Sequence, residues 1–364
     1  MSIRTLTTPL CNLLGISVPI LQAGMGGVAY APLAAAVTNA GGLGALGGID
    51  MTPEEFDGEI RRFRSLSDGP LCVDLGFPSR APTAPGDVAM PAVAPAPIRQ
   101  LYAELEKLGV PIEEVAEQAI GTVDNQAKLV IAIEHGVEVL ACALGTPEDV
   151  TARCHANGMV VMSVVGRASN ARRAINNGTD VVVVQGFEGG GHTGDVGLLT
   201  LLAEVLEFST VPVVAAGGIS RGCQIAAALI AGAEGAWVGT RFLATAESGA
   251  EEGFKEAVVE APPDATIRST LFDGLPVRQL RNRFTDVWHG HEDEVQSYPV
   301  QRMLTAPIRY TAARHGLKEY MNLAAGQSSG MVDDLPGAAE VLERLVDETV
   351  TALRDGPRRI GLGR

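Results

Sequence analysis

The sequence predicts an α/β fold, a (β/α)8 barrel (TIM barrel) with a smaller, mostly helical cap. Short apolar runs alternate with longer helical patterns, which is typical of βα units and a parallel sheet. Eight such runs can be counted, the number of strands in a closed barrel of this kind. The chain has 364 residues, more than the roughly 250 of a typical barrel, which leaves room for extra segments. A doubly wound open sheet is the alternative interpretation of the same alternation.

The composition fits this fold class. Hydrophobic residues make up 46% of the chain, enough for a large core, whereas aromatic residues make up only 4%. Together with 43 glycines, this favours closely packed strands and helices over an aromatic-rich sandwich.

The strands of the barrel are predicted from short, mostly apolar runs. They lie at 18–23, 42–46, 71–75, 137–143, 159–165, 180–185, 211–215 and 235–238. Helical patterns are predicted at 32–39, 52–66, 124–135, 147–157, 169–177, 198–208 and 221–231. The helix at 52–66 has a favourable start, because Pro53 and Glu54 occupy its first turn.

Departures from the βα rhythm divide the chain into regions. After the third strand comes a segment rich in Pro and Ala (RAPTAPGDVAMPAVAPAP) and then a predicted helix at 98–108. Trp288, three of the five tyrosines and many arginines follow the last barrel strand. The predicted regions are a cofactor-binding barrel at 1–77 and 112–253, an insertion at 78–111, a helical cap or substrate domain at 254–334 and a C-terminal helix packing on the barrel at 335–364.

Charge and hydropathy restrict the partners. With a formal net charge of −15, the chain is not expected to bind nucleic acid or anionic lipid. Its longest apolar runs are far shorter than a bilayer span, and its first residues lack the apolar core of a secretion signal. We therefore expect a cytoplasmic protein that acts on small molecules. A homodimer formed through aromatic residues of the cap is a candidate assembly that the sequence does not decide.

The cysteines do not predict a metal site. Cys11, Cys72, Cys142, Cys154 and Cys223 form no CxxC pair, and no Cys/His cluster has zinc-like spacing. Buried, reduced thiols and no bound metal are expected.

Two loops have the features of a phosphate site. Gly217 and Gly218 follow one strand and precede a helix, so backbone N–H groups can approach an anion near the helix N-terminus. Gly239 and Thr240 follow the eighth strand and offer a backbone N–H and a hydroxyl. Loops after the seventh and eighth strands commonly hold phosphate in such barrels. Two tight turns that require glycine are the purely structural alternative.

A third loop, 185–194, follows the sixth strand. It contains five glycines in ten residues, so a helix there would be costly and the backbone must serve another purpose. His192 lies in this loop, where an imidazole can act as a base near neutral pH. A lone histidine is more often structural, but the adjacent phosphate loops favour a catalytic role. By contrast, the GxGxxG pattern at 42–47 falls within a predicted strand and does not indicate a Rossmann turn.

Four segments, in this order, resemble the nitronate monooxygenase family, formerly called 2-nitropropane dioxygenases. They are VPILQAGMGG, VVVVQGFEGGGHTG, VPVVAAGGIS and WVGTRF. The resemblance continues in the predicted cap with RNRF, YPVQRMLT and AAGQSSG. It implies an FMN-dependent barrel that oxidises alkyl nitronates or nitroalkanes with O2 to a carbonyl compound and nitrite.

The resemblance also implies roles for individual residues. His192 falls on the family's catalytic histidine. The implied FMN-binding residues are Ala23, Gly24, Met25, Asp74, Gln185, Gly190, Gly217, Gly218, Trp237, Val238, Gly239 and Thr240. Asp74 stands where the family usually has Asn, and a carboxylate there would alter the flavin's hydrogen bonding or act as a base.

Two other functions remain open at this point. FMN-type enoyl-acyl-carrier-protein reductases share a very similar glycine–histidine loop and the GTRF segment, so an NAD(P)H-dependent reductase of enoyl thioesters or quinones is one alternative. A barrel that binds a phosphate ligand without a flavin, whether non-catalytic, an aldolase or an isomerase, is the other. Against the latter, no Lys lies at a predicted strand end and no carboxylate cluster suggests a metal.

Overall fold

The computed structural model describes residues 6–77, 89–113, 124–262 and 264–362. Its main element is an eight-stranded parallel sheet in the order β1-β9-β8-β6-β5-β4-β3-β2. The first and last strands of this order, β1 and β2, are joined by a parallel bridge between Leu21 and Leu43. The sheet therefore curves into a nearly closed barrel. The predicted fold class is therefore confirmed.

Every predicted barrel strand is present, although most are shorter than predicted. They are β1 (Ile20–Gln22), β2 (Gly44–Gly47), β3 (Leu71–Gly76), β4 (Val139–Ala143), β5 (Val160–Val165), β6 (Val181–Gln185), β8 (Val213–Ala216) and β9 (Gly235–Val238). The glycine pattern at 42–47 falls largely in β2, as expected. The ends of the apolar runs lie beyond the hydrogen-bonded ladder, which explains the shorter strands.

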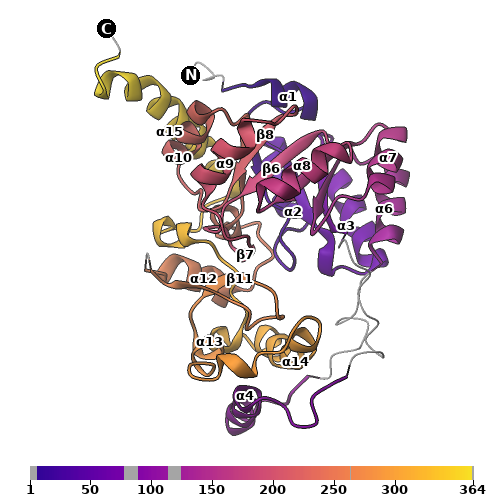
Figure 1. Cartoon of the computed structure of the whole chain (residues 1–364), viewed down its shortest axis with the longest axis vertical. Helices are drawn as coiled ribbons and strands as arrows, with labels where there is room; N and C mark the ends of the chain where they lie inside the picture. The colour runs from indigo at the N-terminus through magenta and orange to yellow at the C-terminus, as the bar shows by residue number, and fades with distance from the viewer. Residues whose placement is uncertain (1–5, 78–88, 114–123, 263, 363–364) are drawn as a thin grey trace.

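Helices follow the strands and cover the outside of the barrel (Figure 1). They are α2 (Ala31–Asn39), α3 (Pro53–Leu66), α6 (Asn125–Glu134), α7 (Glu148–Ala156), α8 (Ala168–Asn176), α9 (Leu198–Leu206), α10 (Gly222–Ala231) and α11 (Thr240–Leu243). The α3 start is a capping box, in which Thr52 Oγ1 accepts from the Glu55 amide and the Glu55 carboxylate accepts from the Thr52 amide. A short helix, α1 (Pro9–Leu14), precedes the barrel.

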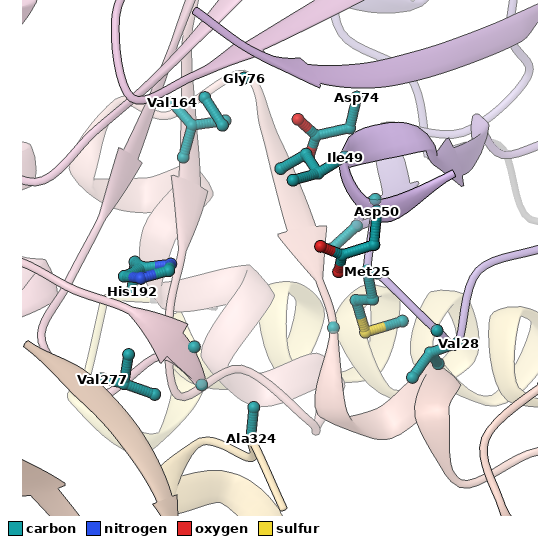
Figure 2. A pocket seen from close by; sticks show the side chains of 18 of the residues that line it. Met25, Val28, Ile49, Asp50, Asp74, Gly76, Val164, His192, Val277 and Ala324 are labelled. Carbon is teal, nitrogen blue, oxygen red and sulfur yellow. The ribbon is translucent and has the colours of Figure 1, made fainter. Parts of the chain in front are cut away.

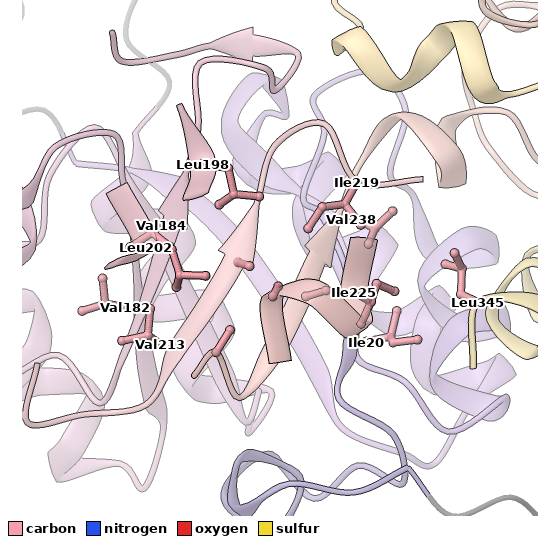
Figure 3. Packing of buried hydrophobic residues seen from close by; sticks show 14 of the residues in the cluster. Ile20, Val182, Val184, Leu198, Leu202, Val213, Ile219, Ile225, Val238 and Leu345 are labelled. Atoms are coloured by element: carbon pink, nitrogen blue, oxygen red, sulfur yellow. The ribbon is translucent and has the colours of Figure 1, made fainter. Parts of the chain in front are cut away.

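Alternate residues of each strand face two different apolar clusters. Val182, Val184 and Val238 point outward and pack against the surrounding helices (Figure 3). Leu21, Val183 and Trp237 point inward and fill the barrel. This double burial explains why the strands are almost continuously apolar.

The segments beyond the barrel gather at one end of the molecule (Figure 1). They contain α12 (Glu252–Glu260), β10 (Thr266–Ser269), β11 (Val277–Leu280), α13 (Arg283–Asp286), η3 (Glu292–Glu294), α14 (Val300–Arg314), η4 (Lys318–Tyr320) and η5 (Gln327–Met331). From the insertion predicted at 78–111, α4 (Ala96–Lys107) joins this group, and its Ile98, Leu101 and Leu105 pack with Phe284 and Trp288. Residues 78–88 of that insertion lie outside the described part of the chain.

The sequence did not predict the strands β10 and β11. With β7 (Gly191–His192) from the glycine loop they form a small antiparallel sheet in the order β10-β11-β7. Both strands are four residues long and mix apolar with polar side chains, so their pattern alone is too short to predict a strand.

The last helix, α15 (Ala338–Arg359), returns to the barrel and packs on α10 and α2 through Val341, Leu342 and Leu345. Arg241 supports this return, because its guanidinium donates to Asp334 Oδ1 at 2.8 Å and to the Asp334 carbonyl at 2.9 Å. Within the described residues, no helix is long and apolar enough to cross a membrane. All five cysteines are free thiols, but Cys223 is exposed, contrary to the expectation that the thiols are buried.

Candidate active site

A large cavity opens where the loops after the barrel strands meet the segments beyond the barrel. Its volume is about 2370 Å³, well above the range of roughly 300–1,000 Å³ for typical small-molecule sites. The loops after β1, β3, β6, β8 and β9 all contribute to its wall. This is the C-terminal face of the barrel, where active sites of this fold are found.

Most of the residues predicted for the site line this one cavity. They are Ala23, Gly24, Met25, Asp74, Gln185, Gly190, His192, Gly217, Gly218, Trp237, Gly239 and Thr240. Val238 is the exception, because it does not line the cavity. Its side chain is buried in the outer cluster, because it alternates with Trp237 along β9 and so faces the helices. Its carbonyl accepts from the Ala23 amide at 2.9 Å, so Val238 supports the β1 loop through its backbone.

His192 is oriented by a carboxylate that sequence analysis missed. Its Nε2 lies 2.7 Å from Oδ2 of Asp273, whose side chain is only 1% exposed. The other carboxylate oxygen of Asp273 accepts from the Leu275 amide at 2.9 Å, which fixes the carboxylate. The His192 side chain itself is 38% exposed and faces the cavity (Figure 2). Nothing in the sequence singles out Asp273, which lies 81 residues from His192.

The glycine loop is fixed at several points. Gln185 Nε2 donates to the His192 carbonyl at 2.9 Å, and β7 pairs with β11 through Val277 opposite His192. Arg278 donates through Nε to the Phe187 carbonyl at 2.8 Å. Gly190 has no room for a side chain, because a Cβ would lie 2.8 Å from backbone atoms of Ala325. These contacts hold His192 in a defined position in spite of the five surrounding glycines.

The turns after β8 and β9 have the backbone that the phosphate hypothesis requires. Gly217 and Gly218 have φ values of +99° and +70°, which favour glycine. A Cβ on Gly217 would lie 2.8 Å from the Gly186 carbonyl oxygen, so the turn also packs tightly on the glycine loop. Thr240 Oγ1 accepts from the Gly326 amide at 3.0 Å, which leaves its own proton available to a ligand.

Asp74 lies on the opposite side of the cavity from His192 (Figure 2). It is 5% exposed, and its Oδ1 has no hydrogen-bond partner among the described residues. Burial raises the pKa of Asp74 to about 8. A carboxyl group with that pKa is mostly protonated at neutral pH.

Positive charge enters the cavity from α14, which the sequence analysis did not assign to the site. Arg302 pairs with Asp50 of η1 (Gly48–Asp50) at 3.1 Å. The Arg309 guanidinium lies 4.0 Å from the centre of the Phe272 ring, and burial lowers its pKa to about 10. Among the described residues, no group of His, Cys, Asp and Glu side chains is arranged to hold a metal ion.

The fold and this cavity define a (β/α)8-barrel enzyme with its active site at the C-terminal ends of the strands. The family model "Nitronate monooxygenase" matches residues 7–348. A probable nitronate monooxygenase of Staphylococcus haemolyticus is 33% identical over 93% of this chain and 96% of its own. The chain therefore belongs to the nitronate monooxygenase family and is an oxidoreductase.

Two further relatives show how varied the similar proteins are. The crystal structure of nitroalkane oxidase from Streptomyces ansochromogenes has a TM-score of 0.81 and 36% identity, covering 97% of this chain and 99% of that one. A Mycobacterium tuberculosis protein named (3aS,4S,5R,7aS)-5-hydroxy-7a-methyl-1-oxo-octahydro-1H-indene-4-carboxyl-CoA dehydrogenase is 31% identical over 96% of this chain and 98% of its own. Family membership alone therefore does not fix the substrate.

Proposed function

We propose that this protein uses FMN and O2 to oxidise alkyl nitronates, and nitroalkanes after deprotonation, to a carbonyl compound and nitrite. The observation that carries the proposal is the joint placement of two features in one cavity. One is a histidine held by a buried carboxylate, and the other is a pair of glycine turns suited to a phosphate. Small-molecule substrate and O2 are the only partners that this reaction needs.

The residues of the cavity fit FMN. The turns at Gly217–Gly218 and Gly239–Thr240 would hold its phosphate through backbone N–H groups and the Thr240 hydroxyl, close to the N-terminus of α10. The loop of Ala23, Gly24 and Met25 would lie against the ring system together with Asp74, Gln185, Gly190 and Trp237. When bound, FMN supplies the redox chemistry, taking electrons from the substrate and passing them to O2. The cavity is large enough for this group and a substrate together.

His192 is the proposed base for nitroalkanes. Because Nε2 donates to Asp273, Nδ1 is left as the atom that can accept the α-proton of the substrate. Asp273 keeps the imidazole in this tautomer and stabilises the positive charge that proton transfer creates. The apolar part of the wall, including Met25 and Val164, weakens solvation of the nitro group, and we propose that this aids removal of the α-proton.

The proposal predicts different results for His192→Ala with the two substrate forms. A nitroalkane needs its α-proton removed, so we expect kcat/KM for nitroethane to fall by roughly 10²–10⁴-fold. Ethyl nitronate is already deprotonated, so its turnover falls by much less. Oxygen consumption and nitrite release measure both reactions in the FMN-loaded protein. Equal turnover of nitroethane by wild type and variant would refute the role of His192.

A reductase acting on an acyl thioester or a quinone is the second candidate. It is favoured by the CoA thioester in the name of the mycobacterial relative and by a cavity that admits a large, acidic substrate beside Arg302 and Arg309. Rapid anaerobic reduction of the bound flavin by NADPH or NADH, with no reduction by nitronate, would select this reaction. The fold and the FMN site would be unchanged by that result.

A further inference from the structure

Asp74 has an unusual position for an acidic side chain. It lies near the carboxyl end of β3, in register with Gly47 of β2 and Ala141 of β4. The backbone of Gly24 covers it closely, since a Cβ added to Gly24 would lie 2.2 Å from the Asp74 Cβ. Its carboxyl group nevertheless lines the cavity, where Oδ1 is buried and lacks a hydrogen-bond partner among the described residues. A buried, unpartnered polar atom of this kind indicates that a ligand group completes its hydrogen bonding.

Among the described residues, Asp74 forms no ion pair, and burial is the cause of its raised pKa. Arg309, which also lines the cavity, lies over the Phe272 ring. Cys72 lies on the same inward face of β3 as Asp74, and Cys142 on β4 points to the outer side of the barrel. Burial raises the pKa of both thiols well above the usual value, so they stay neutral. Across the cavity, Arg302 is paired with Asp50, and His192 is paired with Asp273. An ionised Asp74 would therefore be a buried charge without a counterion, which is a costly arrangement.

We propose that Asp74 is a neutral carboxylic acid in the working enzyme and donates its O–H in a hydrogen bond to the flavin ring. This inference rests on the FMN assignment made above. The Gly24 loop that would lie against the ring is the same loop that covers Asp74, so the acid and the ring share one side of the cavity. The polar edge of an isoalloxazine ring consists largely of acceptor nitrogens and carbonyl oxygens, which pair with a donor and repel a carboxylate.

Proton loss from Asp74 then has a defined consequence. Desolvation raises the pKa of Asp74 to about 8. The acid is therefore mostly protonated at pH 7 and becomes ionised as the pH rises above its pKa. Ionisation removes the donor and places a negative charge beside a ring that itself gains negative charge on reduction. Flavin affinity and flavin reduction potential are therefore both expected to fall as the pH rises through about 8.

The test compares the wild type with Asp74→Asn, which is isosteric, retains an N–H donor and cannot ionise. The FMN dissociation constant and the midpoint potential of bound FMN are measured between about pH 6.5 and 9.5, on either side of the raised pKa. In the wild type, the dissociation constant rises roughly tenfold across this range, the effect of losing one good hydrogen bond. Asp74→Asn shows no such rise. Ionisation of FMN itself is common to both proteins and cancels in the comparison.

Two further variants make the result specific. Asp74→Leu lacks a donor and is expected to bind FMN about tenfold more weakly than wild type at pH 7. Cys72→Ala retains the acid and is expected to keep the wild-type pH profile. The proposal is overturned if wild type and Asp74→Asn follow the same pH profile, or if Cys72→Ala abolishes the rise.

The experiment also separates this proposal from the proposed function. If the wild type fails to bind FMN at every pH, the proposed function fails and the role of Asp74 fails with it. If FMN binds equally well to both proteins at every pH, only the role of Asp74 is excluded.

Discussion

At the residue scale, the chemistry of this site depends on two acidic side chains in contrasting surroundings. Asp273 is buried but accepts hydrogen bonds from the Leu275 amide and from His192, which suits a carboxylate. Asp74 is buried, its Oδ1 has no hydrogen-bond partner within the described part of the chain, and its pKa is raised to about 8. The same residue type therefore serves as an anionic support for a base on one side of the cavity and as a neutral acid on the other.

Asp273→Asn tests the support of the base. The amide fits the same space but no longer stabilises a protonated His192, so kcat/KM for nitroethane is expected to fall roughly 10²-fold. Turnover of ethyl nitronate, which needs no base, is expected to stay within a few-fold of wild type. Asp293→Asn, an exposed change in η3, is the matched control and should leave both activities unchanged. A parallel loss for both substrates in Asp273→Asn would point to misfolding or to another role.

At the element scale, the small sheet β10-β11-β7 connects the glycine loop to the segments beyond the barrel. It places β7, and with it His192, against β11, while the loop from β10 to β11 carries Asp273. The other side of the loop packs on 325–327, where Gln327 donates to the Glu188 carbonyl at 2.9 Å. A catalytic loop of five glycines is thus ordered by contacts from later parts of the chain.

Gly190→Ala tests this packing. The new Cβ would lie 2.8 Å from the backbone of Ala325 and Gly326, so one of the two segments must move. We expect a loss of roughly 1–3 kcal/mol in the free energy of unfolding, measured by urea denaturation. Gly58→Ala in α3 is the control, because its Cβ meets nothing within 4 Å and should stabilise that helix by up to about 1 kcal/mol. Equal stability of the two variants would contradict the close approach seen here.

At the scale of the whole molecule, the barrel could be predicted because its pattern is local. Each strand is a short apolar run and each helix has its own periodicity, so eight units can be counted along the chain. The loops at the carboxyl ends of those strands necessarily meet, which is why Gly217, Gly239 and His192 could be assigned to one site.

The parts that could not be predicted depend on contacts between distant segments. Asp273 approaches His192 only after β11 pairs with β7, and one aspartate among 43 acidic residues carries no local signal. The raised pKa of Asp74 follows from burial beneath Gly24, which is not visible in sequence. The family resemblance implies Val238 together with Trp237, but the Val238 side chain faces the helices, because neighbouring strand residues face opposite sides.

The most direct test of the central claim is to mix the FMN-loaded protein with ethyl nitronate in the absence of air and to monitor the absorbance of the flavin. The proposed function predicts that the flavin is bleached by nitronate, that NADPH under the same conditions leaves it oxidised, and that nitrite appears when air is admitted. Bleaching by NADPH with no response to nitronate would contradict the account and assign the protein to the reductases.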